Sequence, residues 1–389
     1  MRKFLCSLMI CAGLASPVWA KCGGSFDSFV NELMRDAQTR GFSEQQAEAF
    51  FQGVRSDQAV LKADRRQGVF QLRFTEFARR LISANRIERG RANAAKWDSV
   101  FEQIERDYGI SRGVLLAFWA FETDYGTFQG DFNTRDALVT LAHDCRRPNL
   151  FRPQIFAAMQ LFANGDFDPQ RTTGAWAGEI GMVQMLPADI LENGVDGDGD
   201  GRVTLKTSVP DALLSGAKML QSLGWRAGEP WLQEVTLPDT LDLALTGLPT
   251  QLSVMEWQAL GVKGRTSTLW QGLTGSVLLP EGKDGPAFFA YPNFRVFFEW
   301  NQSFTYVLTA AYFANRLNGA PVFDAGSPRP GLSGDDMKLL QQKLTARGYD
   351  VGKIDGILGA GTRAAVRSVQ KEMGLPVDAW PTAGLLQRL

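Results

Sequence analysis

The chain has 389 residues, of which 44% are hydrophobic and 21% are charged, a composition typical of a globular protein with room for two or three domains. Its 41 Lys and Arg residues are balanced by 42 Asp and Glu residues, which argues against nucleic acid as a partner. The single histidine, His143, argues against zinc peptidases and amidases, because these enzymes generally draw two or three ligands from histidine. A serine triad is also disfavoured, because the chain contains no G-x-S-x-G elbow.

The first 20 residues are predicted to be a secretory signal peptide. Arg2 and Lys3 precede the apolar run FLCSLMICAGL, and SPVWA ends in the small residue Ala20, after which we expect cleavage. No later stretch is long and apolar enough for a transmembrane segment, so we expect an exported, soluble protein. Cleavage removes two of the 41 basic residues and none of the 42 acidic ones, which leaves a net charge of −3.

Two of the four cysteines, Cys22 and Cys145, remain after this cleavage. Because disulfides persist outside the cytosol, we expect these two residues to pair. A reactive pair of Cys145 with His143 is a weaker alternative, since residues two apart on a helix or turn point away from each other.

Three stretches carry apolar residues at a spacing of three to four, and they predict an almost wholly helical region over 25–165: residues 25–54, 67–91 and 97–110. Ser43 and Ser111 are expected to cap helices in this region. From about residue 231, Pro and Gly alternate with β-branched and aromatic runs, which predicts short strands around a hairpin. A further helix is predicted over 304–318.

Residues 324–334, DAGSPRPGLSG, have the composition of a linker, and residues 335–389 are predicted to form a compact helical unit after it. This unit contains a helix, then GY, an Asp-Gly turn, and G-x-x-T at the start of a second helix. It resembles the three-helix peptidoglycan-binding domain found at the ends of many bacterial wall enzymes. The matching residues are Leu340, Gln341, Leu344, Gly348, Tyr349, Gly352, Asp355, Gly356, Gly359, Thr362, Ala365, Val366, Gln370 and Gly374. The resemblance implies binding to wall glycan or stem peptide, with Tyr349, Asp355 and Thr362 as the polar or stacking candidates.

A wall-binding unit narrows the catalytic candidates to enzymes of murein, and the lack of histidines leaves glycan cleavage by carboxylates. The stretch FWAFETDYG (118–126) places Glu122 on a predicted apolar stripe, since Trp119 and Phe118 lie three and four residues before it. Burial there raises the pKa of a carboxyl group above about 4.3, so that it can donate a proton to a leaving glycosidic oxygen near neutral pH. Alternatively, Glu122 ends a helix at the rim of the core, with a backbone or basic partner.

The segments FETDYG (121–126) and GAWAGEIGMVQMLPADIL (174–191) together resemble the B-type lytic murein transglycosylase family. In that family, an E-T-x-x-G helix end carries the one catalytic acid, and a G-x-x-A-G-x-x-G-x-x-Q-x-x-P segment lines the sugar cleft. The resemblance extends from about Phe26 to Gly319. Its further segments are DCRR (144–147), DGDGDG (196–201), SVPDAL (208–213), NFRVFFEWNQSFTY (293–306) and ANRLNG (314–319).

Carried over by position, the resemblance makes Glu122 the catalytic acid and base and places Gln184 near the bound muramoyl sugar. Asn301 and Tyr306 are expected at the far wall of the cleft. The full set of expected substrate-binding residues is Gln184, Tyr125, Met185, Asn301, Tyr306 and Trp300. Asp124 receives no role, because a residue two positions from Glu122 on a helix points elsewhere.

The chain departs from the family pattern at three of these cleft positions. Ala175 stands where many members have Ser, Glu179 where they have a small residue, and Trp300 where they have Tyr. The first change removes a potential hydrogen bond to sugar, and the second adds an acid close to the cleft. The substrate detail stays open as a result, whereas the assignment of the acid does not depend on these positions.

These observations predict a mainly α (α+β) protein. A lysozyme-like helical catalytic domain with a small β-hairpin region is expected over residues 21–323, after the signal peptide over 1–20. A separate three-helix peptidoglycan-binding domain is expected over 335–389, after the linker over 324–334. An exported enzyme of murein acts in the periplasm, which is therefore the expected location.

The resemblance implies that Glu122 protonates the oxygen of the bond between N-acetylmuramic acid and N-acetylglucosamine. It then takes a proton from the C6 hydroxyl of the muramoyl sugar, so that the product ends in a 1,6-anhydro sugar. The residues alone indicate acid-assisted glycan cleavage, and ordinary glycosidases use two carboxylates. Two alternatives stay open: a muramidase that hydrolyses the same bond, and a wall-binding or scaffold protein without activity. No cofactor is expected for catalysis, and the expected partners are peptidoglycan strands and, as further candidates, other cell-wall enzymes.

The segment VDGDGDGRVTLKTSVPD (195–211) resembles part of a calcium-binding loop. Its acidic residues Asp196, Asp198 and Asp200 lie at alternate positions before a Gly, as in the first half of an EF-hand. Thr207 stands in the place of the usual twelfth-position Glu, and Asp211 is the candidate replacement. A weak structural calcium site is therefore predicted, with a solvated Asp-Gly turn as the alternative.

Overall fold

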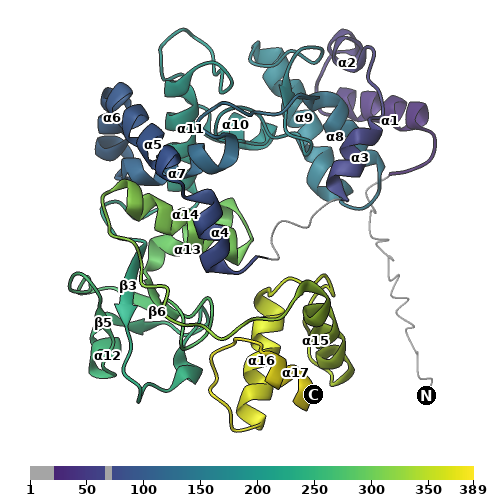
Figure 1. Ribbon diagram of the computed structural model, residues 1–389. Coiled ribbons are helices and arrows are strands. Elements are labelled where there is room, and N and C mark those ends of the chain that lie inside the picture. The colour runs from purple at the N-terminus through teal and green to yellow at the C-terminus, as the bar shows by residue number, and fades with distance from the viewer. Residues whose placement is uncertain (1–21, 66–71) are drawn as a thin grey trace, which may run out of the picture.

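The computed structural model describes residues 22–65 and 72–389 (Figure 1). The predicted signal peptide and residues 67–71 of the second predicted helical stretch lie outside the described residues. None of the helices within the described ranges combines the length and the hydropathy needed to cross a membrane.

The first part of the described chain is helical, as predicted. Its helices are α1 Phe26–Thr39, α2 Glu44–Phe51, α3 Gln58–Asp64, α4 Phe74–Leu81, α5 Ala84–Lys96, α6 Asp98–Tyr108, α7 Arg112–Thr123, α8 Thr134–His143 and α9 Pro148–Asn164. The predicted cap at Ser43 is confirmed, because its side chain and that of Gln46 form a reciprocal capping box. Ser111 lies at the predicted cap position before α7, but its side chain makes no capping hydrogen bond to the helix. Its hydroxyl instead accepts a hydrogen bond from the Asn318 side chain.

Helix α7 lies in the centre of the main core. Its residues from Gly113 to Ala120 are all buried, which is typical of a helix surrounded by protein on every side. It packs along α14 (Phe304–Leu317), and Gly113 permits the close approach, since a Cβ there would lie 2.6 Å from the Ala314 carbonyl oxygen. The C-terminal end of α7 therefore has a fixed position relative to α14.

The segment with the predicted cleft motif is held beside α8 by a short pair of strands. Strands β1 (Phe132–Asn133) and β2 (Thr173–Gly174) pair antiparallel, and β1 leads directly into α8. Helix α10 (Pro187–Asn193) begins within the last residues of the cleft motif, and α11 (Val209–Ser222) follows it; both lie in the upper part of the fold in Figure 1.

The predicted strands after residue 231 are confirmed, and they form a sheet larger than one hairpin. Its strands are β3 Leu232–Thr236, β4 Leu252–Ser253, β5 Lys263–Gly264, β6 Thr274–Leu278 and β7 Phe288–Ala290, in the antiparallel order β4-β6-β7-β3-β5. The short 3₁₀ helix η2 (Leu243–Leu245) precedes β4, and α12 (Val254–Ala259) follows it. The sheet and α12 enclose a second core, which includes Trp257 and Phe289.

The chain then returns to the main core and ends in a helical unit. Helix α13 (Pro292–Trp300) leads into α14. The last helices are α15 Gly334–Ala346, α16 Ala360–Glu372 and α17 Ala383–Arg388, around a third core that includes Leu340, Leu344, Val366 and Val369. The predicted class is thus confirmed: the protein is mainly α with a small sheet, and a three-helix unit with its own core ends the chain.

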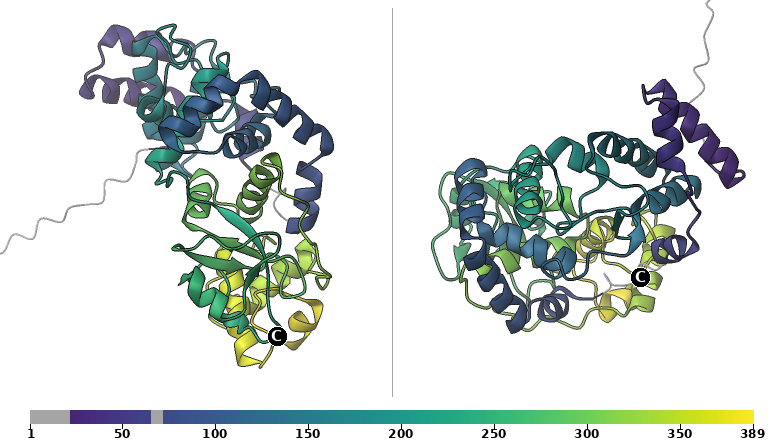
Figure 2. Two further views of the ribbon diagram at one scale, coloured as in Figure 1. Left: turned by 90° about the vertical axis from the view of Figure 1, so that its left-hand side faces the viewer. Right: turned by 90° about the horizontal axis from the view of Figure 1, so that it is seen from above.

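The C-terminal unit lies beside the sheet and away from α1 to α3 (Figures 1 and 2). Arg363 of α16 donates to the Pro280 carbonyl at 2.9 Å and lies over the Phe304 ring at 4.7 Å. The Trp380 indole donates to the Arg329 carbonyl at 2.9 Å, within the expected linker. The C-terminal unit therefore contacts both the sheet region and the first residue of α14.

Candidate active site

Glu122 lies in the last turn of α7, and two aromatic side chains donate to one of its oxygens. The Trp300 indole, at the end of α13, donates to Oε1 at 3.1 Å. The Tyr306 hydroxyl, in the first turn of α14, donates to the same oxygen. None of the described residues donates to Oε2, so this oxygen is the one that can carry a proton.

The surroundings of Glu122 favour its protonated form. Burial raises the pKa of Glu122 to about 7, although the hydrogen bonds from Tyr306 and Trp300 lower it and the charge of Glu179 raises it further. Burial and the charge of Glu122 raise the pKa of Tyr306 well above its ordinary value of 10. The tyrosine therefore remains a neutral donor at the pH where Glu122 titrates.

Trp300 is held by its own ring stacking. Its indole stacks on Phe118 of α7, one turn before Glu122, with ring centroids 4.3 Å apart. This contact fixes the indole so that its N–H points at the carboxyl group. The departure from the family pattern at this position thus keeps a hydrogen-bond donor, since a Tyr hydroxyl and an indole N–H can both donate.

Thr123 joins the end of α7 to the predicted cleft segment, a role that the sequence reasoning missed. Its buried hydroxyl donates to the Met182 carbonyl at 2.6 Å and accepts from the Gly126 N–H at 2.9 Å. The only sequence signal for this role is a Thr directly after the Glu at a helix end. Because of these bonds, the acid and the cleft segment have a fixed relative position.

Gln184 lies in this cleft segment with a left-handed backbone, at φ 54°. Its amide nitrogen donates to the Gly181 carbonyl at 2.7 Å, which fixes the side chain within its own loop. Met185 is the partner of Ile180 in an antiparallel bridge and is only 1% exposed. The prediction that Met185 contacts substrate is therefore wrong, because the side chain belongs to the core.

Tyr125 also differs from its prediction as a substrate-binding residue. It is 8% exposed, its hydroxyl donates to the Arg86 carbonyl at 2.8 Å, and its ring meets Trp119 edge to face. The side chain thus packs between α7 and α5 and leaves no hydroxyl donor for a sugar.

Asn301 lies between α13 and α14, partly exposed, and its side-chain oxygen accepts from the Ser303 N–H at 2.9 Å.

Glu179 is the second acid near the site. Burial raises its pKa, against the opposing effects of its backbone hydrogen bonds and of Arg147. The Ala175 N–H donates to the Glu179 carbonyl at 2.9 Å, which closes the turn that carries both departures from the family pattern. The charge of Glu179 also raises the pKa of Glu122, so Glu179 is one of the groups that act on this acid.

Three of the four predicted calcium ligands lie together. One carboxylate oxygen from each of Asp196, Asp198 and Asp211 lies within 4.8 Å of the others. Asp211 is fully buried and accepts from Gly197, Ser208 and Thr204, so it anchors the loop. Asp200 is not part of this group, since its carboxylate accepts from the Arg202 N–H at 2.9 Å.

The structure joins Cys22 to Cys145 in a disulfide, as predicted. In the C-terminal unit, Thr362 is fully buried and accepts from the Gln341 amide at 3.2 Å, so the prediction that it contacts the wall is wrong. Asp355 accepts from the Ile357 N–H at 2.9 Å, and the Tyr349 hydroxyl donates to Glu372 on α16. Tyr349 and Asp355 are both partly exposed, so both remain candidates for contact with the wall.

A helical domain with a buried central helix, at whose end burial raises the pKa of a glutamic acid to about 7, is the expected lysozyme-like arrangement. The chain belongs to the family described as the transglycosylase SLT domain, which it matches over residues 25–315. Residues 333–389 match the family of peptidoglycan binding domains.

The chain is similar along nearly its whole length to a solved structure of this family. The crystal structure of SltB3 from Pseudomonas aeruginosa in complex with NAG-anhNAM-pentapeptide has a TM-score of 0.86 and 35% identity, over 94% of this chain and 99% of that one. The Escherichia coli lytic transglycosylase Slt35, solved in complex with calcium, shares the fold with a TM-score of 0.66 and 21% identity, over 77% of this chain and 96% of that one.

A curated relative is the membrane-bound lytic murein transglycosylase B of Escherichia coli (strain K12). It is 23% identical over 234 residues, which are 60% of this chain and 64% of that protein. The chain thus aligns with less than two thirds of the length of this relative.

Proposed function

We propose that the protein is a lytic transglycosylase of peptidoglycan that cleaves the β-1,4 bond between N-acetylmuramic acid and N-acetylglucosamine and leaves a 1,6-anhydromuramoyl end. The observation that carries this proposal is the geometry at Glu122: Trp300 and Tyr306 donate to one oxygen of its carboxyl group and leave the other oxygen without a donor among the described residues. Burial raises the pKa of this group to about 7. A group that is half protonated near neutral pH can act first as an acid and then as a base.

In the first step, the proton of Glu122 moves to the glycosidic oxygen, and the bond between C1 and that oxygen breaks. The N-acetylglucosamine side leaves as an alcohol, and positive charge develops at C1 of the muramoyl sugar. The C6 hydroxyl of the same sugar then forms a bond to C1, and the Glu122 carboxylate takes its proton. The acid is thereby restored, and no water is consumed.

Trp300 and Tyr306 serve both steps because they contact Oε1 and leave Oε2 to the moving proton. Their hydrogen bonds stabilise the carboxylate that forms after the first transfer, which counteracts the burial that favours the acid. The balance of these effects keeps the pKa close to the operating pH. The proposal is also supported by the similarity to SltB3, whose crystal structure contains an anhydro muramoyl ligand.

Mass spectrometry of the products from purified sacculi tests the reaction directly. A lytic transglycosylase releases muropeptides with anhydro ends, which are one water lighter than the reducing ends that a hydrolytic muramidase produces. Reducing ends alone would favour the muramidase, and the absence of released fragments would favour a wall-binding or scaffold protein.

We also propose that the chain works as two units in the periplasm after export. The similarity of residues 333–389 to peptidoglycan binding domains and the separate core of α15 to α17 support a wall-binding unit. The apolar sequence of residues 1–20 after two basic residues supports export, and the disulfide between Cys22 and Cys145 suits an oxidising compartment.

Deletion of residues 330–389 is expected to leave a folded, active catalytic domain, because the main core lies outside this segment. Co-sedimentation with insoluble sacculi should weaken by ~10-fold or more, since one of two binding units is lost. The melting temperature should also fall, because the deletion removes the Arg363 contacts with Pro280 and Phe304. A truncated protein that is insoluble, or that sediments as strongly as the full chain, would contradict the division into two units.

A structural calcium ion is proposed for the loop between α10 and α11. The described residues fit such an ion: Asp196, Asp198 and Asp211 converge, and none of them pairs with a Lys or Arg side chain in the described parts of the chain. These three residues would hold the ion and stiffen the loop after Gln184, whereas the proton transfers at Glu122 need no metal.

Millimolar calcium is accordingly expected to raise the melting temperature of the wild-type protein by several degrees, through binding to the folded state. Asp198→Asn should abolish most of this increase. Asp200→Asn is the matched control and should keep it, because the Asp200 carboxylate is turned to the Arg202 N–H. Equal melting temperatures of the wild type in calcium and in EDTA would identify the loop as an ordinary Asp-Gly turn.

A further inference from the structure

The backbone directly after Glu122 is strained. Helix α7 ends at Thr123, and Asp124, Tyr125 and Gly126 follow with φ angles of 51°, 59° and 83°. A left-handed conformation costs a residue other than Gly about 1–2 kcal/mol. Within the described chain, Asp124 and Tyr125 are the one place where two such residues are consecutive. Specific contacts must therefore hold this turn.

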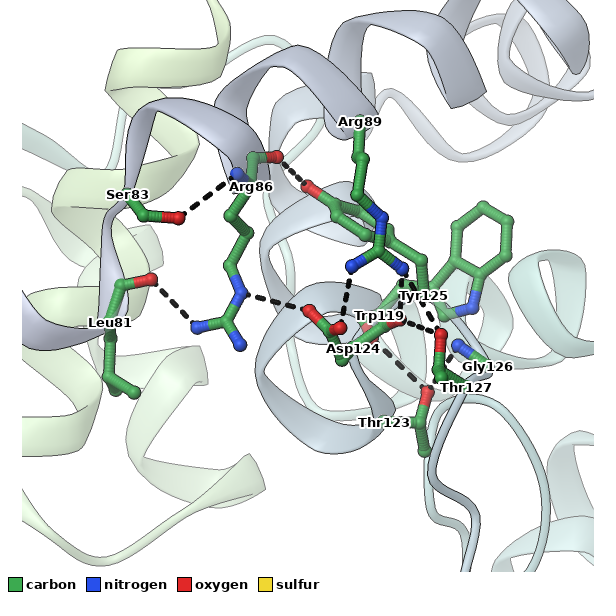
Figure 3. Close-up of polar contacts among 10 residues, drawn as sticks. All are labelled: Leu81, Ser83, Arg86, Arg89, Trp119, Thr123, Asp124, Tyr125, Gly126 and Thr127. Carbon is green, nitrogen blue, oxygen red and sulfur yellow. Dashed lines mark hydrogen bonds and ion pairs between the residues drawn. The ribbon is translucent and has the colours of Figure 1, made fainter.

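Two arginines of α5 hold Asp124 (Figure 3). The Arg86 Nε donates to Asp124 Oδ1 at 3.1 Å, and the Arg89 Nη1 donates to Oδ2 at 2.6 Å. The Arg89 Nη2 donates to the Asp124 backbone carbonyl at 2.8 Å and to Thr127 Oγ1 at 3.1 Å. One guanidinium group thus fixes the side chain and the backbone of the same left-handed residue.

The second strained residue is also anchored on α5. The Tyr125 hydroxyl donates to the Arg86 carbonyl at 2.8 Å, and Arg86 itself donates to the Leu81 carbonyl at 2.7 Å (Figure 3). Gly90 permits the close approach, because a Cβ there would lie 2.5 Å from the Tyr125 hydroxyl. Gly90 is the one buried residue of α5, and Ile87 and Ala94 are only partly buried, so the polar contacts add to what holds α5 to the end of α7.

The turn has a fixed relation to the acid on its other side as well. Thr123, between Glu122 and Asp124, is bonded to the Met182 carbonyl of the cleft segment. The end of α7 is therefore held by α5 on one side and by the cleft segment on the other. A small rotation of this turn would move the Glu122 carboxyl group relative to both Tyr306 and the cleft segment.

We propose that Asp124, clamped by Arg86 and Arg89, is a positioning residue that holds the end of α7 so that Glu122 meets the glycosidic oxygen. The inference rests on the proposed function of Glu122 and deepens it. Partial burial raises the pKa of Asp124, but hydrogen bonds and charges from Arg89 and Arg86 outweigh it and lower the pKa below its ordinary value. The clamp is therefore an ionic one at the pH of catalysis.

The test is kinetic and uses the full chain with soluble glycan strands as substrate. Asp124→Asn is expected to lower kcat by ~10-fold with little change in KM, because small misplacements of a reacting group are costly while binding contacts persist. Asp107→Asn is the matched control with the same charge change, since among the described residues Asp107 pairs with its neighbour Arg106 on the surface of α6. It should retain wild-type kcat.

Asp124→Gly separates positioning from mere backbone stabilisation. Glycine adopts the left-handed conformation freely, so the variant removes the strain together with the carboxylate and should fold stably. The proposal expects its kcat to fall as in Asp124→Asn, and Arg89→Lys to lower kcat too, because Lys cannot hold the carboxylate and the carbonyl together. A kcat for Asp124→Gly within twofold of the wild type, measured well below its melting temperature, would overturn the proposal.

Hydrogen exchange gives a readout that does not depend on the reaction. The amide of Gly126 should exchange ~5-fold faster or more in Asp124→Asn than in the wild type, and at the wild-type rate in Asp107→Asn. Unchanged exchange at Gly126 would overturn the clamp. If the wild-type protein releases no fragments from sacculi, the proposed function fails, whereas this exchange measurement still tests the clamp by itself.

Discussion

Replacement of Glu122 by Gln is expected to abolish nearly all turnover on purified sacculi. The amide keeps the size of the side chain and can still accept hydrogen bonds from Trp300 and Tyr306, but it can neither donate the proton nor take one back. Because general acid–base catalysis contributes a factor of roughly 10²–10⁴, a decrease of at least that size is expected for a group that acts in both steps. Release of soluble muropeptides measures this loss.

Glu102→Gln on the exposed face of α6 is the matched control, and it should retain full activity and sacculus binding. Wild-type folding of Glu122→Gln should be visible in an unchanged circular dichroism spectrum. Retention of about half of the activity would remove Glu122 from its proposed role.

The same substitution is also expected to change how the free energy of unfolding depends on pH. Burial raises the pKa of Glu122 in the folded state to about 7 from an ordinary 4.5, so folding favours the protonated form. This contribution is fully present below pH 4.5 and is lost as the pH rises through 7. The wild type should therefore lose up to roughly 3 kcal/mol of unfolding free energy on this account, a loss that Glu122→Gln avoids.

Denaturant unfolding of both proteins at pH 5 and pH 8 measures the difference. The variant should gain stability relative to the wild type at the higher pH, while their difference at pH 5 should be smaller. An equal difference at the two pH values would show that Glu122 titrates in the folded protein as it does in the unfolded chain.

Replacement of Tyr306 by Phe is expected to have the second largest effect. The hydroxyl lowers the pKa of Glu122 and stabilises its carboxylate, so its removal should raise that pKa above about 7. The activity that needs protonated Glu122 should then persist to higher pH, and the alkaline limb of kcat/KM should move upward. The maximal kcat should fall by roughly 10–100-fold, because the carboxylate formed in the first step loses a donor.

Trp300→Phe is the matched variant for the second donor. It removes the indole N–H but keeps an aromatic ring against Phe118, so the alkaline limb should again move upward. The shift should be the smaller of the two, because the Tyr306 hydrogen bond lowers the pKa of Glu122 more than that of Trp300 does. A limb that stays at the wild-type pH in both variants would mean that neither donor acts on the catalytic carboxyl group.

The sequence made the environment of Glu122 predictable because a helix has a fixed period. Trp119 and Phe118 lie one turn before the acid, and an apolar stripe at that spacing indicates burial whatever the rest of the chain does. The disulfide between Cys22 and Cys145 was predictable for a similar reason, since only two cysteines remain after the expected cleavage. The order of helices, strands and C-terminal helices followed from the local spacing of apolar residues, Gly and Pro.

The wrong predictions concern residues in turns, where a side chain can point either toward the substrate site or into the core. Tyr125 and Met185 lie within or beside motifs of the family, and the sequence predicted that both contact substrate. Tyr125 follows two residues after the helix end, where the left-handed backbone turns it toward α5. Met185 pairs with Ile180 in a bridge that buries its side chain. Helical or strand periodicity does not apply in such turns, so the direction of a side chain depends on contacts that are distant in sequence.

The sequence by itself thus determined the fold class, the position of an acid on a buried helix and the presence of a separate helical unit at the C-terminal end, because each is visible in local patterns of residues. The tertiary structure decided what acts on that acid. Trp300 and Tyr306 lie 178 and 184 residues after Glu122 in the chain, and Arg86 and Arg89 lie 38 and 35 residues before Asp124. The pKa of a carboxyl group depends on burial and on donors within a few ångströms, and only the packing of α5, α13 and α14 around the end of α7 brings these groups to that distance.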